Sequence, residues 1–152
     1  MVLDRSEGLI RHAAIADLGA GLAWSDVWAY DACAAGTPWR VALPSEGASF
    51  ALGLGAGFWL NASAAGSLLV VGAVPASARV ALCAGWNLVG LPGFAIGVRV
   101  ADLKLATRAD AVVGFDPADP YHTRPLADAE ILATGQGLWA RVPADVTWVV
   151  AG

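Results

Sequence analysis

Tryptophan is the residue type in this sequence that is best suited to binding chemistry. There are seven tryptophans in 152 residues, and the flat face of an exposed indole ring can stack on a sugar ring. In the strands expected around them, Trp59 and Trp139 share the more polar face with Asn61 and Arg141. Two other tryptophans lie near expected loops, so the candidate ligand-stacking residues are Trp59, Trp139, Trp24 and Trp39.

A structural interpretation of these tryptophans competes with the binding one. An aromatic residue on a strand is more often buried than exposed, so Trp59 and Trp139 would then be covered where two parts of the chain pack together. Solvent exposure separates the two hypotheses, because a carbohydrate-binding function fails if none of the four side chains is exposed.

No set of residues predicts catalysis, a cofactor or a metal centre. His12 and His122 are the only histidines, and neither has Cys or carboxylate neighbours at the spacing of zinc ligands. No serine lies in a nucleophile-elbow pattern. Asp116 and Asp119 could contribute to a calcium site, although two carboxylates beside prolines more often form a plain turn. We therefore expect no catalytic residue, no cofactor, no metal and no enzymatic activity.

The glycine-rich segment 53–57 has only a superficial likeness to a phosphate-binding loop. Such a loop needs a helix behind it, whereas the residues that follow are typical of a strand. Glycines recur before a later strand, at Gly135 and Gly137. We expect these glycines to permit a bulge or a close contact between strands.

The overall composition predicts a folded domain. Hydrophobic residues make up 57% and charged residues 14% of the sequence, where charged residues usually make up about a quarter. A net charge of −4 without any cluster of Lys or Arg argues against nucleic-acid binding. Residues 47–78 contain no charged side chain, but glycines and Pro75 divide them into short pieces typical of buried strands, so no membrane span is expected.

The chain resembles itself at two offsets. An offset of 85 residues aligns 27–31 with 112–116, and an offset of 80 aligns 55–59 with 135–139. The gap between the two matches falls in a loop-like passage rich in Gly, Pro and Asp, where deletions are tolerated. We predict two tandem pseudo-repeats, 1–73 and 74–152, and at the same offset the first of them lacks its opening strand.

Each pseudo-repeat is expected to be mainly β, sandwich-like or barrel-like, with one short helix. Residues 79–91 form a long apolar run that predicts one strand buried on both faces. Its segment 83–92 is expected to be central in the sheet of the second unit. The first unit would keep an open edge or borrow a strand from a neighbouring segment or another copy of the chain.

Helical spacing over 98–108 predicts a short helix with a counterpart at 10–22. Asp17 and Asp102, which occupy equivalent positions, are expected to cap or anchor these helices.

The remaining strands follow from alternation and turn residues. In strand 111–115, Val113 and Phe115 share one face, and Trp28 and Tyr30 take their places in the first copy. Large apolar groups at alternate positions predict that this face is turned toward the core. The strands that complete the second unit are expected at 121–126, and as a hairpin at 135–142 and 146–152.

A family resemblance adds to this interpretation. Residues 85–92 read Gly-Trp-Asn-Leu-Val-Gly-Leu-Pro, and with 114–116 and 135–139 they resemble the tandem "GWNLVSLP … GxGYW" modules of large exported bacterial and archaeal cell-surface proteins. Leu138 and Phe58 stand where that pattern usually has Tyr. The resemblance implies an exported β-rich module with a structural or adhesive role.

Two cysteines and the first residues bear on the cellular compartment. Cys33 and Cys83 allow one disulfide if the protein is exported, and two buried thiols otherwise. Residues 1–8 have no basic region followed by an apolar one, so a signal peptide would have to lie upstream, as expected if the chain begins partway into a unit.

The leading hypothesis is a non-enzymatic structural or adhesion module, located outside the cell or at the cell surface. Its partners would be other domains of the same protein or another copy of the chain. The alternative is a carbohydrate-binding module whose exposed tryptophans bind polysaccharide, and a small hydrolase domain ranks third.

Overall fold

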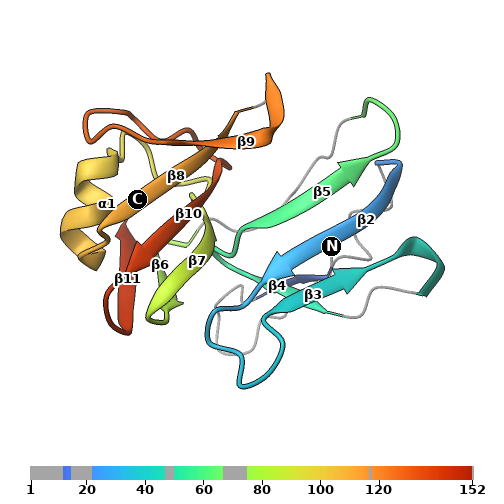
Figure 1. Cartoon of the computed structure of the whole chain (residues 1–152), viewed down its shortest axis with the longest axis horizontal. Coiled ribbons are helices and arrows are strands. Elements are labelled where there is room, and N and C mark those ends of the chain that lie inside the picture. The colour runs from blue at the N-terminus through green and yellow to red at the C-terminus, as the bar shows by residue number, and fades with distance from the viewer. Residues whose placement is uncertain (1–11, 15–21, 47–49, 67–74, 117, 152) are drawn as a thin grey trace.

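The protein is mainly β in a computed structural model that describes residues 12–14, 22–46, 50–66, 75–116 and 118–151 (Figure 1). Its paired strands are antiparallel and belong to sheets of four, three, two and two strands, accompanied by one short α-helix. The predicted mainly β class is therefore confirmed, and the sheets described do not close into a barrel. Two lobes lie side by side in Figure 1, and each has its own buried cluster.

The N-terminal lobe contains strands β1 to β5. Its three-stranded sheet has the order β3-β2-β5, and β1 pairs with β4. Alternate residues of β2 face a small core, in which Val27 is fully buried and Ala42 and Leu52 pack with it. The strands are β1 (His12–Ala14), β2 (Trp24–Tyr30), β3 (Trp39–Ala42), β4 (Ala51–Gly53) and β5 (Phe58–Ala62).

The C-terminal lobe contains the other six strands and the helix. Its four-stranded sheet has the order β7-β10-β8-β9, while β6 and β11 form a separate pair against which α1 packs. Leu138, Ala140 and Val142 alternate along β10 and face a larger core. The elements are β6 (Ser77–Leu82), β7 (Gly85–Gly90), α1 (Val100–Thr107), β8 (Ala111–Asp116), β9 (Asp119–Pro125), β10 (Gly137–Val142) and β11 (Val146–Ala151).

The apolar run 79–91 is two strands, and the prediction of a single one is wrong. β6 and β7 belong to different sheets, and the chain turns between them at residues 83–85. Gly85 has a φ of +107°, a backbone conformation that residues other than glycine rarely adopt. The corner is thus encoded by one glycine inside an otherwise uniform apolar pattern.

The predicted hairpin of β10 and β11 is also wrong. β10 pairs with β7 and β8, whereas β11 pairs with β6 in the other sheet. Residues 143–145 therefore form a second corner between the same two sheets. The two corners are joined, because the backbone N–H of Ala84 donates to Asp145 Oδ1 at 2.9 Å.

Asn87 fixes the first corner from inside the lobe. Its side chain is buried, and its Oδ1 accepts a hydrogen bond from the Cys83 N–H at 3.0 Å. Its Nδ2 donates to the carbonyl oxygens of Cys83 at 2.8 Å and Gly85 at 3.0 Å. One carboxamide thus satisfies three backbone groups that the turn removes from the strand ladder.

The prediction that Val113 and Phe115 of β8 face the core is wrong. Val112 and Gly114 face the core of the lobe, whereas Val113 and Phe115 lie on the other side of the sheet. The equivalent positions of β2 behave in the same way, since Val27 and Ala29 are the core residues there. On that other side, Tyr30 of β2 and Phe115 of β8 contact the opposite lobe, as described below.

The predicted helix at 98–108 is confirmed as α1. The Arg99 N–H donates to Asp102 Oδ2 at 2.9 Å, which confirms that Asp102 caps the helix. In the predicted counterpart at 10–22, β1 is a strand, and the rest of that range, including Asp17, lies outside the described residues. Among the residues described, no helix has the length and apolar character needed to cross a bilayer.

We predict that Asn87→Ala destabilises the protein by about 2 kcal/mol, because it leaves buried backbone groups of the corner without partners. Asn61→Ala makes the same chemical change at an exposed side chain and should stay within about 0.5 kcal/mol of the wild type. Urea denaturation of both variants measures the difference. Equal midpoints for the two variants would show that the Asn87 carboxamide is not needed at the corner.

Candidate functional site

Aromatic side chains from both large sheets meet between the lobes. Tyr30 of β2 packs edge to face against Trp139 of β10, with ring centroids 5.1 Å apart. Trp59 of β5 packs in the same way against Phe115 of β8, with centroids 4.9 Å apart. Each such pair contributes roughly 0.5–1.5 kcal/mol beyond its buried area. The two sheets therefore face each other through a layer of rings.

The two contacts occupy matching places in their sheets. In the N-terminal lobe, Trp28 of β2 lies directly opposite Trp59 of β5. In the C-terminal lobe, Val113 of β8 lies directly opposite Trp139 of β10. Tyr30 and Phe115 each follow two residues later on β2 and β8. Each lobe thus presents an aromatic residue of one strand to the tryptophan of the other lobe.

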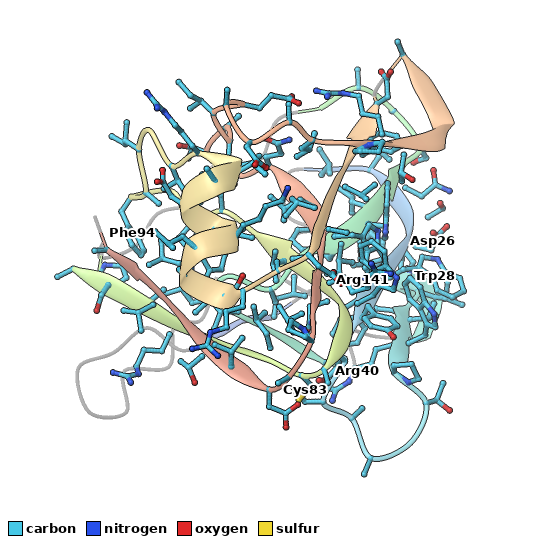
Figure 2. The ribbon with its side chains drawn as sticks, turned by 60° about the vertical axis from the view of Figure 1, so that its left-hand side comes forward. Asp26, Trp28, Arg40, Cys83, Phe94 and Arg141 are labelled. Carbon is cyan, nitrogen blue, oxygen red and sulfur yellow. A yellow bond between two sulfur atoms is a disulfide. The ribbon has the colours of Figure 1, made fainter. Side chains whose placement is uncertain are left out.

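A disulfide joins the lobes. Cys33, which follows β2, is bonded to Cys83 at the first corner, and the two Cα atoms are 5.3 Å apart. The sequence does not decide between a disulfide and two buried thiols, and the structure has the disulfide (Figure 2). Nearby, Asp31 accepts a hydrogen bond from the Cys33 N–H at 3.1 Å and pairs with Arg40 at 2.9 Å.

The backbone also crosses between the lobes, at β7. One edge of β7 pairs with β10, and on the other edge the Gly57 N–H donates to the Leu88 carbonyl at 3.2 Å. The Gly90 N–H donates to the Gly55 carbonyl at 2.9 Å. β7 is the outer strand of its four-stranded sheet and Trp86 is 38% exposed, so the predicted central position is wrong. Its last three residues nevertheless serve both lobes.

Gly55 and Gly57 make this crossing fit, which confirms the predicted close contact at these two glycines; a Cβ at Gly53, Gly135 or Gly137 would meet nothing within 4 Å. A Cβ at Gly57 would lie 2.8 Å from the Val89 carbonyl oxygen. Gly55 has a φ of +81°, and a Cβ there would collide with Val80. The segment passes directly over β6 and β7.

An open groove of about 390 Å³ lies beside the Tyr30–Trp139 contact. The guanidinium carbon of Arg141 lies 5.5 Å from the centre of the Trp86 ring, so a cation occupies one face of this indole. Arg141 in turn donates through Nε to Asp110 Oδ1 at 2.8 Å. The residues that line the groove are Tyr30, Trp86, Val113, Thr123 and Trp139.

The four predicted stacking residues are placed differently from one another. Trp139 lines the groove and is half-buried, and Trp39 is 40% exposed with its ring 6.0 Å from that of Trp139. Trp59 is half-buried against Phe115, and Trp24 packs on the core of the N-terminal lobe. The structure brings Trp39 and Trp139 together and leaves the other two apart.

Sequence reasoning missed Trp86 as a candidate for stacking. Trp86 and Arg141 are directly opposed on β7 and β10, and Trp86 is 38% exposed. Both facts depend on the pairing and position of β7, which the sequence alone does not give.

A carboxylate and a second missed tryptophan lie on β2, the middle strand of the N-terminal sheet (Figure 2). Trp28 is 42% exposed, and its Nε1 donates to Asp26 Oδ1 at 2.9 Å. Asp26 also accepts hydrogen bonds from Ser25 Oγ at 2.7 Å and from Asn61 Nδ2 at 3.2 Å. The Ser25 bond, with those from Asn61 and Trp28, lowers the pKa of Asp26.

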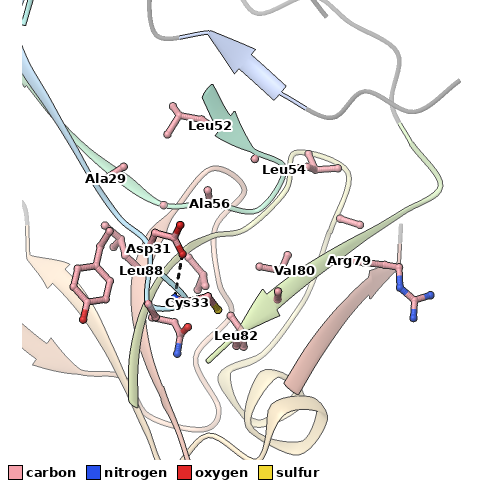
Figure 3. Close-up of a pocket in the computed structure, with 18 of the residues that line it drawn as sticks. Ala29, Asp31, Cys33, Leu52, Leu54, Ala56, Arg79, Val80, Leu82 and Leu88 are labelled. Atoms are coloured by element: carbon pink, nitrogen blue, oxygen red, sulfur yellow. Dashed lines mark hydrogen bonds between the residues drawn. The ribbon is translucent and has the colours of Figure 1, made fainter. Parts of the chain in front are cut away.

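A second cavity of about 640 Å³ lies under the crossing, between β2 and β4 on one side and β6 and β7 on the other (Figure 3). Its walls are mostly apolar, with Leu52, Leu54, Val80 and Leu88 among them. Asp31 lies at the edge, beside the disulfide. Of its polar lining residues, Asp31 and Arg40 pair with each other, and Asn87 bonds the backbone of the first corner.

The residues considered above as metal ligands do not form a metal site among the described side chains. Asp116 Oδ1 accepts a hydrogen bond from the Ala118 N–H at 2.9 Å, as in the plain turn that competes with a calcium site. The side chains of His12, His122 and Asp119 lie outside the described residues. In the part of the chain that the structure describes, no three His, Cys, Asp or Glu side chains gather as metal ligands would.

No known family, curated protein or solved structure matches this chain.

We predict that Gly57→Ala destabilises the protein by about 1–3 kcal/mol, because the added methyl meets the backbone of β7 and Ala56–Gly57 cannot then keep its contact with Val89. Gly53→Ala is the matched control, since a Cβ there meets nothing within 4 Å, and it should be neutral or stabilising by up to about 1 kcal/mol. Thermal unfolding measures both. A Gly57 variant as stable as the Gly53 variant would contradict the close crossing.

We also predict that Asp110 titrates below its ordinary pKa of 3.8, because its hydrogen bond with Arg141 favours the carboxylate. The pair then contributes stability above the unfolded-state pKa and loses it as the pH falls through the lower folded-state pKa. Arg141→Gln should return the Asp110 midpoint toward 3.8 and shift the indole resonance of Trp86. Carbon-detected NMR titration checks both, and an ordinary midpoint in the native protein would rule out the pair.

Proposed function

We propose that this chain is a non-enzymatic structural or adhesion module of an exported cell-surface protein, built from two tandem pseudo-repeats, 1–73 and 74–152. The observation that carries the proposal is the Cys33–Cys83 disulfide, which closes across the two lobes. Cystine bridges persist in oxidising compartments and are rare inside most cells. A module that is covalently closed across its halves suits a protein that must keep its shape outside the cell.

Strand register supports the two pseudo-repeats. Ala29 lies opposite Phe58 in the N-terminal lobe, and Gly114 lies opposite Leu138 in the C-terminal lobe. These four positions agree with the sequence offsets of 85 and 80 residues. The same offsets relate the Ala14–Ala51 pair of β1 and β4 to the isolated bridge between Arg99 and Ile131. Agreement at several independent pairings favours a duplication.

The packing of the sheets supports the sandwich-like description. The three-stranded and four-stranded sheets face each other across the aromatic layer. The Tyr30–Trp139 and Phe115–Trp59 contacts relate the lobes reciprocally, as in an interface with two-fold symmetry. Such a pair is complete in itself, so partners are expected to attach elsewhere, through neighbouring domains or at the groove.

Carbohydrate binding is the alternative function, and one observation favours it. Trp39 and Trp86 are each close to two-fifths exposed, and Trp139, which contacts Trp39, lines the same groove as Trp86. The exposure that the tryptophan hypothesis required is therefore present at Trp39, whereas Trp24 is half-buried against the core of its lobe.

We predict that loss of the disulfide lowers stability by about 4 kcal/mol, the chain-entropy value for cysteines separated by 50 residues. Chemical denaturation of the wild type with and without reductant, and of the Cys33→Ser/Cys83→Ser double variant, measures the effect. Reductant should destabilise the wild type alone. Two titratable thiols in protein recovered from an oxidising compartment would overturn the structural proposal.

A further inference from the structure

We infer that the groove beside Trp86 binds a neutral polysaccharide, with a pyranose ring stacked on the exposed part of the Trp86 indole. This inference gives the adhesion role proposed above its ligand class and depends on that role.

The Trp86 ring is held ready for stacking. The Arg141 guanidinium covers one face, and Asp110 fixes Arg141 from the side. The indole is nevertheless 38% exposed, so its remaining surface is what the groove presents. An aromatic side chain fixed in this way loses little conformational entropy when a ligand stacks on it.

The rest of the groove suits a sugar. Tyr30 and Trp139 add two more rings, and Thr123 adds a hydroxyl group. A sugar ring offers C–H groups to aromatic surfaces and hydroxyl groups that both donate and accept hydrogen bonds. The guanidinium of Arg141 and the carboxylate of Asp110, beside Trp86, provide both donors and acceptors. A proline-rich peptide, the other ligand that aromatic grooves bind, offers carbonyl acceptors only.

The local charges favour a neutral ligand. Arg141, the cation that lies over Trp86, is paired with Asp110 and is therefore not free to hold a uronic acid or a sulfate. The described side chains that line the groove include no carboxylate that could hold an amine.

Packing between the lobes does not require Trp86. The rings that pack between the lobes are Tyr30 with Trp139 and Trp59 with Phe115. Trp86 instead contacts Arg141 of its own lobe and is 38% exposed, so its free surface is available for another role.

The test is a titration of the intact, disulfide-bonded chain with cellohexaose, xylohexaose and mannohexaose, followed by NMR at the tryptophan indole N–H groups. We expect at least one of these neutral probes to bind and to shift the resonances of Trp86 and Trp139. Trp86→Ala should weaken binding by about tenfold or more, which corresponds to the loss of one aromatic contact. Trp86→Tyr keeps a ring on the site and should retain part of the affinity.

Trp28→Ala is the matched control, because Trp28 is exposed to a similar extent and does not line the groove; its affinity should stay within about twofold of the wild type. Three results would overturn the inference: no binding of any neutral hexasaccharide, equal binding by Trp86→Ala, or binding of decaproline or hexagalacturonate in place of the neutral sugars. Reductant sensitivity is measured separately, so a chain that keeps its disulfide but binds no sugar loses this inference and keeps the structural proposal.

Discussion

The reciprocal aromatic contact between the two sheets is the interaction on which the other features depend. Tyr30 with Trp139 and Trp59 with Phe115 bring the sheets face to face, and the lobes are further linked by the disulfide and by the crossing at β7. Each lobe presents a tryptophan of one strand and an aromatic residue of the neighbouring strand to the other lobe, so the two contacts are reciprocal. Tandem copies of such a module would be joined through their connecting chain rather than through this face.

The crossing at β7 couples the lobes more tightly than side-chain packing alone. Asn87 holds the corner from which β7 starts, and Cys83 in that same corner carries the disulfide. Further along the strand, Leu88 accepts a hydrogen bond from Gly57 and Gly90 donates one to Gly55 of the other lobe. A strand that completes one sheet and borders the other makes separate unfolding of the lobes unfavourable, since either event breaks pairing of the same strand.

Sequence reasoning reached the element types, the mainly β class, the helix cap at Asp102 and the close contact at Gly57. It did not reach strand pairing. Alternation along β8 was correctly recognised, but both of its faces are covered, so the larger residues Val113 and Phe115 indicated the wrong one as the core side. Pairing partners and corners depend on contacts between residues that are distant in sequence. Gly85 adopts a positive φ at the corner, but one glycine within an apolar run does not by itself predict that the run is divided.

The same gap explains why the site was predicted only in part. The place of Trp39 near a loop and of Trp139 on the more polar face of its strand predicts both as stacking residues, and the structure places them together. The apolar run around Trp86 predicts a buried strand. Its partner Arg141 lies 55 positions away in the sequence, so the contact between the two side chains is not predicted. Once β7 is recognised as an outer strand, its first residues lack the cover that a central strand would have. Exposure of Trp86 then follows from topology, and the cation above its ring turns that exposure into a defined surface.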